Sequence, residues 1–160
     1  MQRAFVALGA NLADPLTQVR AALAALAGLP QSRLVHASSL YRTRPVGIHG
    51  QPDFINAVAA LATTLTPQEL LAALFDLEAQ FGRRRDFHQA PRTLDLDLLL
   101  YADKVIATPE LTLPHPRMHL RAFVLAPLLE IAPDCRIPGR GRAGAWLPAV
   151  SMQPIQRLGE

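Results

Sequence analysis

The chain has 160 residues, of which 50% are hydrophobic, and a formal net charge of +3. This length suffices for one domain that buries its own core, so we expect a single domain over residues 1–160. The single cysteine excludes an intramolecular disulfide, and the apolar run at 3–9 is too short for a signal peptide or a membrane span, so we expect a cytoplasmic protein.

Residues 3–9 are a short apolar run of the kind that forms a buried strand. Asp14 followed by Pro15 predicts the N-cap and first turn of a helix, which we expect to end at Gly28. The apolar residues of this segment recur at helical spacing, so the chain is predicted to begin with a strand and a helix that packs on it.

Two further strands are predicted over residues 32–42 and 54–64. Both are rich in Val, Ile, Thr and Tyr, which alternate with small or polar residues. The loop at 43–53 holds several prolines and glycines, so the two strands can pair as a long hairpin.

The second predicted helix is marked by its first residues. Thr66, Pro67 and Glu69 form a capping box with proline at the first helical position, and Gly82 is a typical stop. The apolar side of this helix is expected to carry Leu70, Leu71, Leu74, Leu77 and Phe81.

The second half is predicted to hold a strand at 94–101, a return strand at 105–107 and a third helix at 118–130. Residues 136–160 show no clear pattern, and we expect them to be partly irregular. The order β-α-β-β-α-β predicts an α+β fold, the ferredoxin-like sandwich, with helices on one face of an antiparallel sheet. The other face would be an open ligand-binding face.

Two carboxylates on the predicted strand 94–101 point to chemistry. Side chains on a strand alternate, so Asp95 and Asp97 project from one face, about 7 Å apart. An isolated pair of this kind also fits the solvent side of an amphipathic strand. Asp is a poor strand former and like charges repel, however, so a bound cation explains the pair better. Mg²⁺ fits, because it takes one or two carboxylates together with water and substrate phosphates.

Cationic side chains surround this pair in the sequence. Each alone would pass as a surface charge, but together with a metal-binding pair they are typical of a site for phosphates, since phosphoryl transfer is catalysed by positioning and charge neutralisation. The loops at 43–53 and 83–91 are long enough to close over a nucleotide. The cationic candidates are Arg83, Arg84, Arg85, Arg92, His115 and Arg121.

Five blocks of sequence recur in a known family. They are Gly-Ala-Asn-Leu at 9–12, Ser-Leu-Tyr-Arg-Thr at 39–43, Gln-Pro-Asp-Phe-Ile-Asn-Ala at 51–57, Pro-Arg-Thr-Leu-Asp-Leu-Asp at 91–97, and the segment from Leu113 to Phe123. In this order and spacing they resemble the 6-hydroxymethyl-7,8-dihydropterin pyrophosphokinases. The resemblance runs from about residue 3 to 134, and its central motif at 91–97 is highly specific.

The resemblance implies an enzyme that binds ATP with two Mg²⁺ ions and then the pterin, whose hydroxymethyl oxygen attacks the β-phosphorus and releases AMP. The implied metal ligands are Asp95 and Asp97. The implied catalytic residues are Arg83, Arg92, Asp95, Asp97 and His115. The implied ATP-binding residues are Glu78, Arg85, Arg92, Leu98, Thr112, His115 and Arg121. The implied pterin-binding residues are Thr43, Val46, Phe54, Asn56 and Phe123, with the two phenylalanines stacked on the pterin ring unless they serve only core packing.

Some positions depart from the family pattern. Residues 86–90 are one residue short and lack a tryptophan, while Glu110 and Pro116 replace a basic and an aromatic residue, and Phe54 replaces a tyrosine. These changes concern nucleotide affinity and loop closure more than the chemistry.

Two other classes of function compete with the pyrophosphokinase. An RNA-binding module of the same fold would need aromatic side chains on its central strands, where this chain has Asp95 and Asp97. A metal-dependent nucleotidyl transferase or nuclease would normally need a further carboxylate. We therefore expect a monomer that acts on small molecules, with neither nucleic acid nor membrane as a partner.

Overall fold

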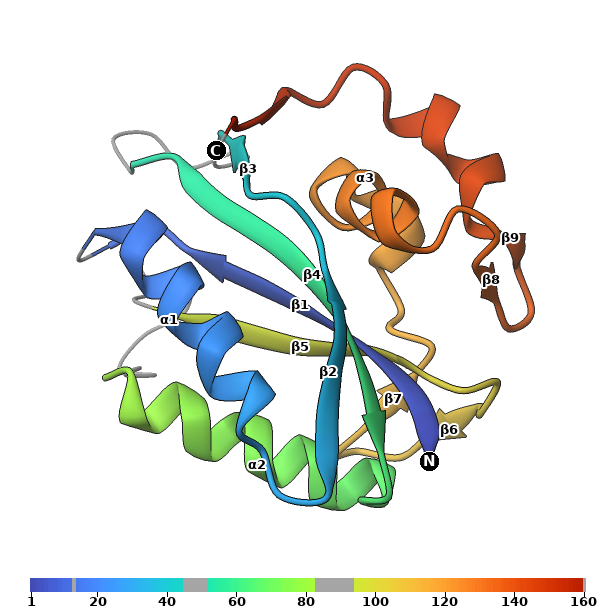
Figure 1. Ribbon diagram of the computed structural model, residues 1–160. Coiled ribbons are helices and arrows are strands. Elements are labelled where there is room, and N and C mark those ends of the chain that lie inside the picture. The colour runs from blue at the N-terminus through green and yellow to red at the C-terminus, as the bar shows by residue number, and fades with distance from the viewer. Residues whose placement is uncertain (13, 45–51, 83–93, 160) are drawn as a thin grey trace.

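The computed structural model describes residues 1–12, 14–44, 52–82 and 94–159. Its main strands and helices follow one another in the order that the sequence predicts (Figure 1). The strands are β1 (Gln2–Ala10), β2 (Ser32–Ala37), β3 (Tyr41–Thr43), β4 (Phe54–Thr63), β5 (Asp95–Tyr101), β6 (Ile106–Ala107), β7 (Thr112–Leu113), β8 (Arg136–Ile137), β9 (Gly141–Arg142) and β10 (Ile155–Arg157). The helices are α1 (Pro15–Ala27), α2 (Pro67–Gln80) and α3 (Ala122–Ile131), with 3₁₀ segments η1 (Met118–Leu120) and η2 (Ala143–Val150).

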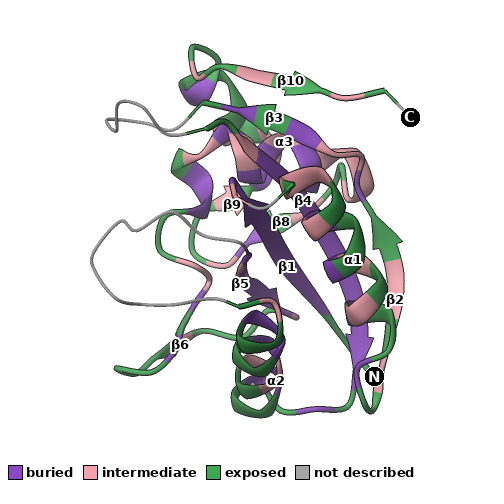
Figure 2. Ribbon diagram, turned by 90° about the vertical axis from the view of Figure 1, so that its left-hand side faces the viewer, coloured by how far each residue is buried: buried purple, intermediate pink, exposed green. Residues whose placement is uncertain are grey.

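One antiparallel sheet of six strands forms the centre of the fold. Its order is β10-β3-β4-β1-β5, and β2 also pairs with β4. Strand β1 pairs with β4 along its whole length on one side and with β5 over Ala4–Gly9 on the other. Figure 2 shows β1 and β4 as mostly buried, whereas the helices carry exposed outer sides. The predicted hairpin is confirmed, because both β2 and β3 pair with β4.

The two faces of the sheet belong to two hydrophobic clusters. Ala4, Val6 and Leu8 of β1 pack in the cluster that includes the buried sides of α1 and α2. Phe5 and Ala7 pack in the cluster that includes α3. Since side chains alternate along a strand, α3 lies on the face opposite α1 and α2 (Figure 1). The expectation that all helices lie on one face of the sheet is therefore wrong, and the open face is covered in part.

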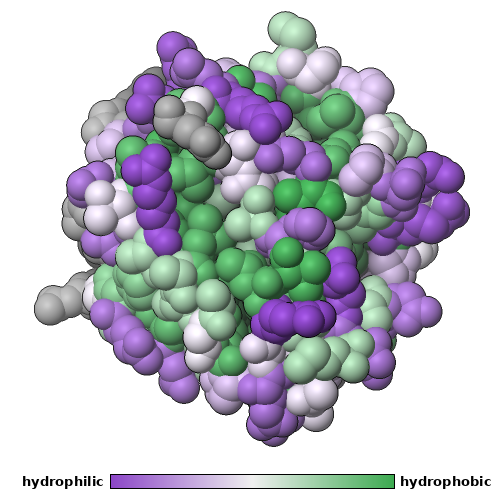
Figure 3. All heavy atoms as spheres, in the orientation of Figure 1, coloured by the Kyte–Doolittle hydropathy of each residue, from purple (hydrophilic) through white to green (hydrophobic). Residues whose placement is uncertain are grey.

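The face toward the viewer in Figure 3 is mixed in polarity. Hydrophilic residues form most of its rim, and hydrophobic residues gather near the middle, over α1 and β2. Partly buried Leu16 and Leu23 of α1 and Leu34 of β2 pack against the first cluster. None of the helices within the described residues is both long and apolar enough to cross a membrane.

The capping predictions have different outcomes for the two helices. At α2 the box is confirmed: the Thr66 hydroxyl accepts from the Glu69 backbone N–H at 3.1 Å, and the Glu69 carboxylate accepts from the Thr66 N–H at 2.8 Å. Asp14 occupies the N-cap position of α1, but its φ of 59° is left-handed and its side chain caps no backbone N–H. Its carboxylate instead accepts from the Thr17 hydroxyl at 2.8 Å.

Three predicted elements are corrected in their extent. The strand 32–42 is divided at Ser38, whose backbone N–H donates to Val58 O and whose hydroxyl accepts from Val58 N, both at 2.9 Å. The helix 118–130 is divided at Arg121, which has an extended backbone (φ −126°, ψ 117°). The return strand 105–107 forms β6, which pairs with β7 rather than with β5.

The C-terminal segment is also more regular than expected. It forms the β8–β9 hairpin, η2 and β10, and β10 joins the main sheet beside β3. Three residues are too few for a strand pattern to be visible in the sequence, so this strand exists because of its partner.

Candidate active site

The register of the central strands places several candidate residues on one face of the sheet. Gly9 of β1 lies opposite Asn56 of β4 on one side and opposite Asp95 of β5 on the other. Residues directly opposite in a ladder share a face, so Asn56 and Asp95 lie on the same side, about 10 Å apart across two strand spacings. Asp97 and Phe54, two residues along from these, share that side as well.

Strand β1 has no side chain at Gly9, where it passes between Asn56 and Asp95. A Cβ on Gly9 would lie 3.0 Å from the Asn56 side-chain nitrogen, closer than a normal contact. Asn56 is held in place, because its side-chain oxygen accepts a 2.7 Å hydrogen bond from the Thr43 hydroxyl and both side chains are buried. The amide nitrogen of Asn56 therefore has a fixed direction beside Gly9.

The family resemblance implies a pterin beside Asn56, and on that expectation Gly9→Ala should raise the KM for the pterin about tenfold while changing the KM for ATP less, because the new methyl group displaces Asn56. The matched control is Gly28→Ala, whose Cβ would meet only Ala25 O, at 3.6 Å. Steady-state kinetics with each substrate varied in turn measures this difference. Equal increases in both KM values would contradict a local role for Gly9.

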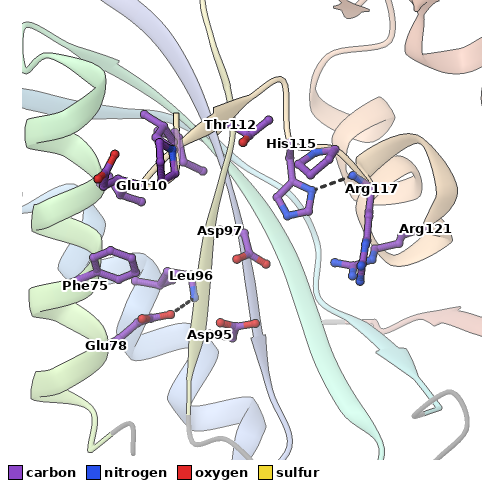
Figure 4. A pocket seen from close by; sticks show the side chains of 15 residues that line it. Phe75, Glu78, Asp95, Leu96, Asp97, Glu110, Thr112, His115, Arg117 and Arg121 are labelled. Atoms are coloured by element: carbon purple, nitrogen blue, oxygen red, sulfur yellow. Dashed lines mark hydrogen bonds between the residues drawn. The ribbon is translucent and has the colours of Figure 1, made fainter. Parts of the chain in front are cut away.

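A cavity of about 530 Å³ lies beside these residues, along the edge strand β5 (Figure 4). Strand β5 lies at the edge of the sheet. The cavity can therefore reach both of its sides, the one that faces α2 and the one that carries the carboxylates. Its lining consists of Leu71, Phe75, Glu78, Asp95, Leu96, Asp97, Leu98, Pro109, Glu110, Leu111, Thr112, His115, Pro116, Arg117 and Arg121.

The wall next to α2 is mainly apolar, with Leu71 and Phe75 projecting from the helix. Glu78 lies one turn further along, almost fully buried, and its carboxylate accepts a 2.8 Å hydrogen bond from the Leu96 backbone N–H. This hydrogen bond joins α2 to β5 at Leu96, the residue between Asp95 and Asp97. Glu78 thus has a structural contact as well as a place in the cavity.

The opposite wall is charged. Figure 4 shows the carboxylates of Asp95 and Asp97 on the same side of β5, facing the side on which His115, Arg117 and Arg121 lie. Leu94, Leu96 and Leu98 are buried in the core, as the alternation predicts. Within the described ranges, no group of three or more His, Cys, Asp or Glu side chains is placed to hold a metal ion without help from a ligand.

His115 is oriented by its own segment. Its backbone N–H donates to Leu99 O at 2.9 Å, and its Nδ1 accepts from the Arg117 backbone N–H at 3.1 Å. Burial, and then the positive charges of Arg121 and Arg117, lower the pKa of His115 to about 4, against a weaker opposing effect of Asp95. The ring is therefore neutral near pH 7, and since Nδ1 accepts, its proton is on Nε2.

Arg121 and Phe123 lie where η1 ends and α3 begins. The Arg121 guanidinium lies over the Phe123 ring, 5.4 Å from its centroid. Phe123 is half-buried and packs against the second cluster, so its ring combines a core contact with an exposed surface.

The structure thus brings most of the predicted residues together in two groups. The cavity contains Glu78, Asp95, Asp97, Leu98, Thr112, His115 and Arg121. Thr43, Phe54 and Asn56 lie on the same face of the sheet but do not line the cavity, and Phe123 adjoins Arg121. The remaining predicted residues lie outside the described ones: Val46, Arg83, Arg84, Arg85 and Arg92.

The sequence analysis named Glu78 but assigned neither Leu71, Phe75 nor Arg117 to the site. Leu71 and Phe75 lie seven and three residues before Glu78, which places them on the same side of α2, and this spacing was a usable signal. Pro109, Leu111 and Arg117 carried none, because their position depends on the turns that follow β5.

An α+β fold whose cavity joins an apolar wall to paired carboxylates, a neutral histidine and two arginines defines an enzyme of the phosphate-transfer class. Residues 5–133 match the family model of 7,8-dihydro-6-hydroxymethylpterin-pyrophosphokinase. The chain belongs to this pyrophosphokinase family.

Individual relatives agree with the family match. The chain is 48% identical over 158 residues to the 2-amino-4-hydroxy-6-hydroxymethyldihydropteridine pyrophosphokinase of Pseudomonas aeruginosa, covering 99% of this chain and 98% of the relative. It is 46% identical to the enzyme of the same name from Haemophilus influenzae, covering 86% of each. The fold resembles the crystal structure of Plasmodium falciparum HPPK-DHPS, with a TM-score of 0.74 at 14% identity over 94% of this chain and 42% of that one.

Proposed function

We propose that the chain transfers pyrophosphate from ATP to the hydroxymethyl group of 6-hydroxymethyl-7,8-dihydropterin, giving AMP and the pterin diphosphate for folate biosynthesis. Family membership supports the reaction. One observation carries the location: Asp95, Asp97, His115 and Arg121 meet at a single cavity beside Asn56.

The fold supports a finer assignment to the ferredoxin-like class. The hairpin of β2, β3 and β4, with β1 and then β5 beside it, follows the order of a β-α-β-β-α-β unit whose two helices are α1 and α2. In this assignment, α3 and β10 are additions that cover part of the second face.

ATP is assigned to the cavity. The adenosine would occupy the apolar wall, near Glu78, Leu98 and Thr112, since a flat base gains most from apolar contact. The phosphates would face His115 and Arg121, joined by Arg83, Arg85 and Arg92 from the segment that follows α2. This arrangement places the triphosphate alongside the two carboxylates.

The pterin is assigned to the neighbouring part of the same face. Asn56 would bond to its amide edge, Thr43 and Val46 would contact it through backbone groups, and Phe54 and Phe123 would stack on its ring. The distance of about 10 Å between the strands that carry Asn56 and Asp95 leaves room for a bicyclic ring between the amide and the carboxylates.

The residues present fit Mg²⁺ as the metal. Asp95 and Asp97 offer hard oxygen ligands on one side of β5, and Mg²⁺ completes its shell from water and substrate phosphates, so a protein-only cluster is not required. When bound between Asp95, Asp97 and the triphosphate, two such ions would neutralise charge on the reacting phosphates.

The work of the chain itself is then positioning and charge neutralisation. The Nε2–H of neutral His115 donates to a phosphate oxygen, and Arg121 offsets the charge that builds up during transfer. The pterin oxygen bonds to the β-phosphorus while the bond from that phosphorus to the oxygen of the α-phosphate breaks. AMP leaves with the bridging oxygen, and the hydroxyl proton passes to water.

The chain is also proposed to act as a cytoplasmic monomer without a nucleic-acid partner. Two carboxylates on the ligand face would repel a phosphate backbone, which argues against RNA binding.

The identity of the nucleotide product tests this function. Incubation with ATP, Mg²⁺ and the reduced pterin alcohol should yield AMP and the pterin diphosphate in equal amounts, which ion-exchange chromatography separates. Formation of ADP alone, or of AMP with free pyrophosphate at the same rate without the pterin, would contradict the proposal.

A further inference from the structure

The last part of the chain contacts the segment that presents His115 and Arg121. The family match ends at residue 133, so this contact lies beyond the region that the match covers. In the tail, η2 (Ala143–Val150) packs on η1, where the Trp146 ring meets the buried His119 ring edge-on with centroids 4.7 Å apart. The tail then passes the start of α3 and joins the sheet as β10.

Gln153 makes a two-sided contact at the break between η1 and α3. Its side-chain oxygen accepts from the Ala122 backbone N–H at 2.8 Å, and its side-chain nitrogen donates to Leu120 O at 2.9 Å. These are the backbone groups on either side of Arg121. We call this pair of hydrogen bonds the Gln153 bridge.

The bridge replaces a missing helix cap. Arg121 is the N-cap residue of α3, and its own side chain caps no backbone N–H. The first N–H groups of a helix have no partner within it, so the Ala122 N–H depends on an outside acceptor, which Gln153 supplies. The bridge thereby holds Arg121 in its extended conformation, from which its side chain reaches the cavity.

The residues after Gln153 are themselves held against strand β3, which carries Thr43, one of the proposed pterin-binding residues. Ile155 of β10 lies opposite Thr43 of β3, and the Leu158 N–H donates to Leu40 O at 2.9 Å. Arg157 contacts the Ser39 hydroxyl at 3.1 Å and the Glu130 carboxylate at 3.3 Å. Gln153 is therefore anchored by its neighbours and can act as a fixed support.

We propose that Gln153 is a positioning residue for the transfer reaction: through its bridge it sets the direction of Arg121 and the start of the helix that carries Phe123. This inference rests on the proposed roles of Arg121 and Phe123 in ligand binding. The bridge is local, because α3 is separately held by the buried side chains of Val124, Leu125 and Leu128. Its loss should therefore misplace Arg121 without unfolding the helix.

Gln153→Met tests the proposal, because it keeps the length of the side chain and removes both hydrogen bonds. We expect kcat/KM for ATP to fall about tenfold because Arg121 loses its fixed direction, whereas the loss of two hydrogen bonds should lower the melting temperature by only a few degrees. Gln153→Glu keeps the acceptor for the Ala122 N–H and should recover part of the rate. The control is Gln156→Ala, an exposed residue of the same tail, which should behave as wild type.

A double-mutant cycle separates this inference from the function on which it rests. If Gln153 acts through Arg121, Gln153→Met should cost little further rate in an Arg121→Ala background. A normal rate for Arg121→Ala alone would overturn the phosphate role of Arg121. A slow Arg121→Ala together with a near-normal Gln153→Met, full additivity of the two, or a rate loss that only follows a large drop in melting temperature, would overturn the inference about Gln153.

Discussion

Asp97→Asn is expected to slow AMP formation by at least about a hundredfold with saturating ATP, and Asp95→Asn similarly. Loss of a residue that hydrogen-bonds to a metal ligand typically costs about 10- to 100-fold, so loss of a direct ligand, the role proposed for Asp95 and Asp97, should cost no less. An amide is a poorer ligand than a carboxylate for a hard cation such as Mg²⁺. Single-turnover rates over a range of Mg²⁺ concentrations measure this effect, and higher Mg²⁺ should recover part of the rate.

The fold should tolerate these two substitutions. Both side chains are only half-buried and line the cavity, and Asn has nearly the same shape, so melting temperatures in EDTA should stay within a few degrees of wild type. Asp103→Asn, an exposed carboxylate in the turn after β5, is the matched control and should affect neither quantity. A variant that melts early yet keeps normal turnover would show that the Asp95 and Asp97 pair is structural.

Local signals in the sequence predicted the elements that depend on local physics. The capping box at Thr66 specifies its helix start by two hydrogen bonds within four residues, and the structure has both. Alternation along residues 94–101 places Leu96 in the core and Asp95 and Asp97 at the cavity, because the period of a strand is fixed by its backbone. These features need no information about distant parts of the chain.

The predictions are wrong where a partner distant in the sequence determines the local structure. Residues 118–130 have a continuous helical pattern, yet the helix is broken at Arg121, where the bridge from Gln153 satisfies the backbone groups on either side. The sheet face expected to be open is covered by α3, whose residues are apolar almost all round, and such a helix needs burial on more than one side. That composition was available in the sequence and signals a covered face.

The residues of the candidate site also differ in whether local sequence or long-range pairing determines their position. Asp95 and Asp97 could be found from spacing, and His115 and Arg121 from a resemblance in motif. The closeness of Asn56 to Asp95 arises only from the register of three strands around Gly9, and strand register is set by long-range pairing rather than by any single segment. Gln153 had no signal at all, since it lies in a tail without a pattern.

His115→Ala is expected to lower kcat about a hundredfold if, as proposed, the side chain supplies a hydrogen-bond donor to charge that grows in the transition state. His115→Gln should lose less, since its amide can still donate in place of the Nε2–H. The exposed His36 offers a matched control, and His36→Ala should leave the rate unchanged. Stopped-flow or quenched single-turnover measurements with saturating substrates report the chemical step for each variant.

The pH dependence provides a sharper test of how His115 acts. Its pKa in the fold is lowered to about 4, whereas a histidine in the unfolded chain has its ordinary value of about 6.5. As the pH falls, the unfolded chain takes up this proton first, so His115 contributes stability above about pH 6.5 that is lost as the pH falls toward 4. In the folded enzyme the ring stays neutral, so kcat/KM should show no change assignable to His115 between about pH 6 and 8. Urea unfolding should accordingly show a shallower loss of stability from about pH 6.5 to 5 in His115→Gln than in wild type. A step in kcat/KM near pH 6.5 that disappears in His115→Gln would instead show that the charged imidazolium is the working form, and the neutral donor assigned to His115 would be wrong.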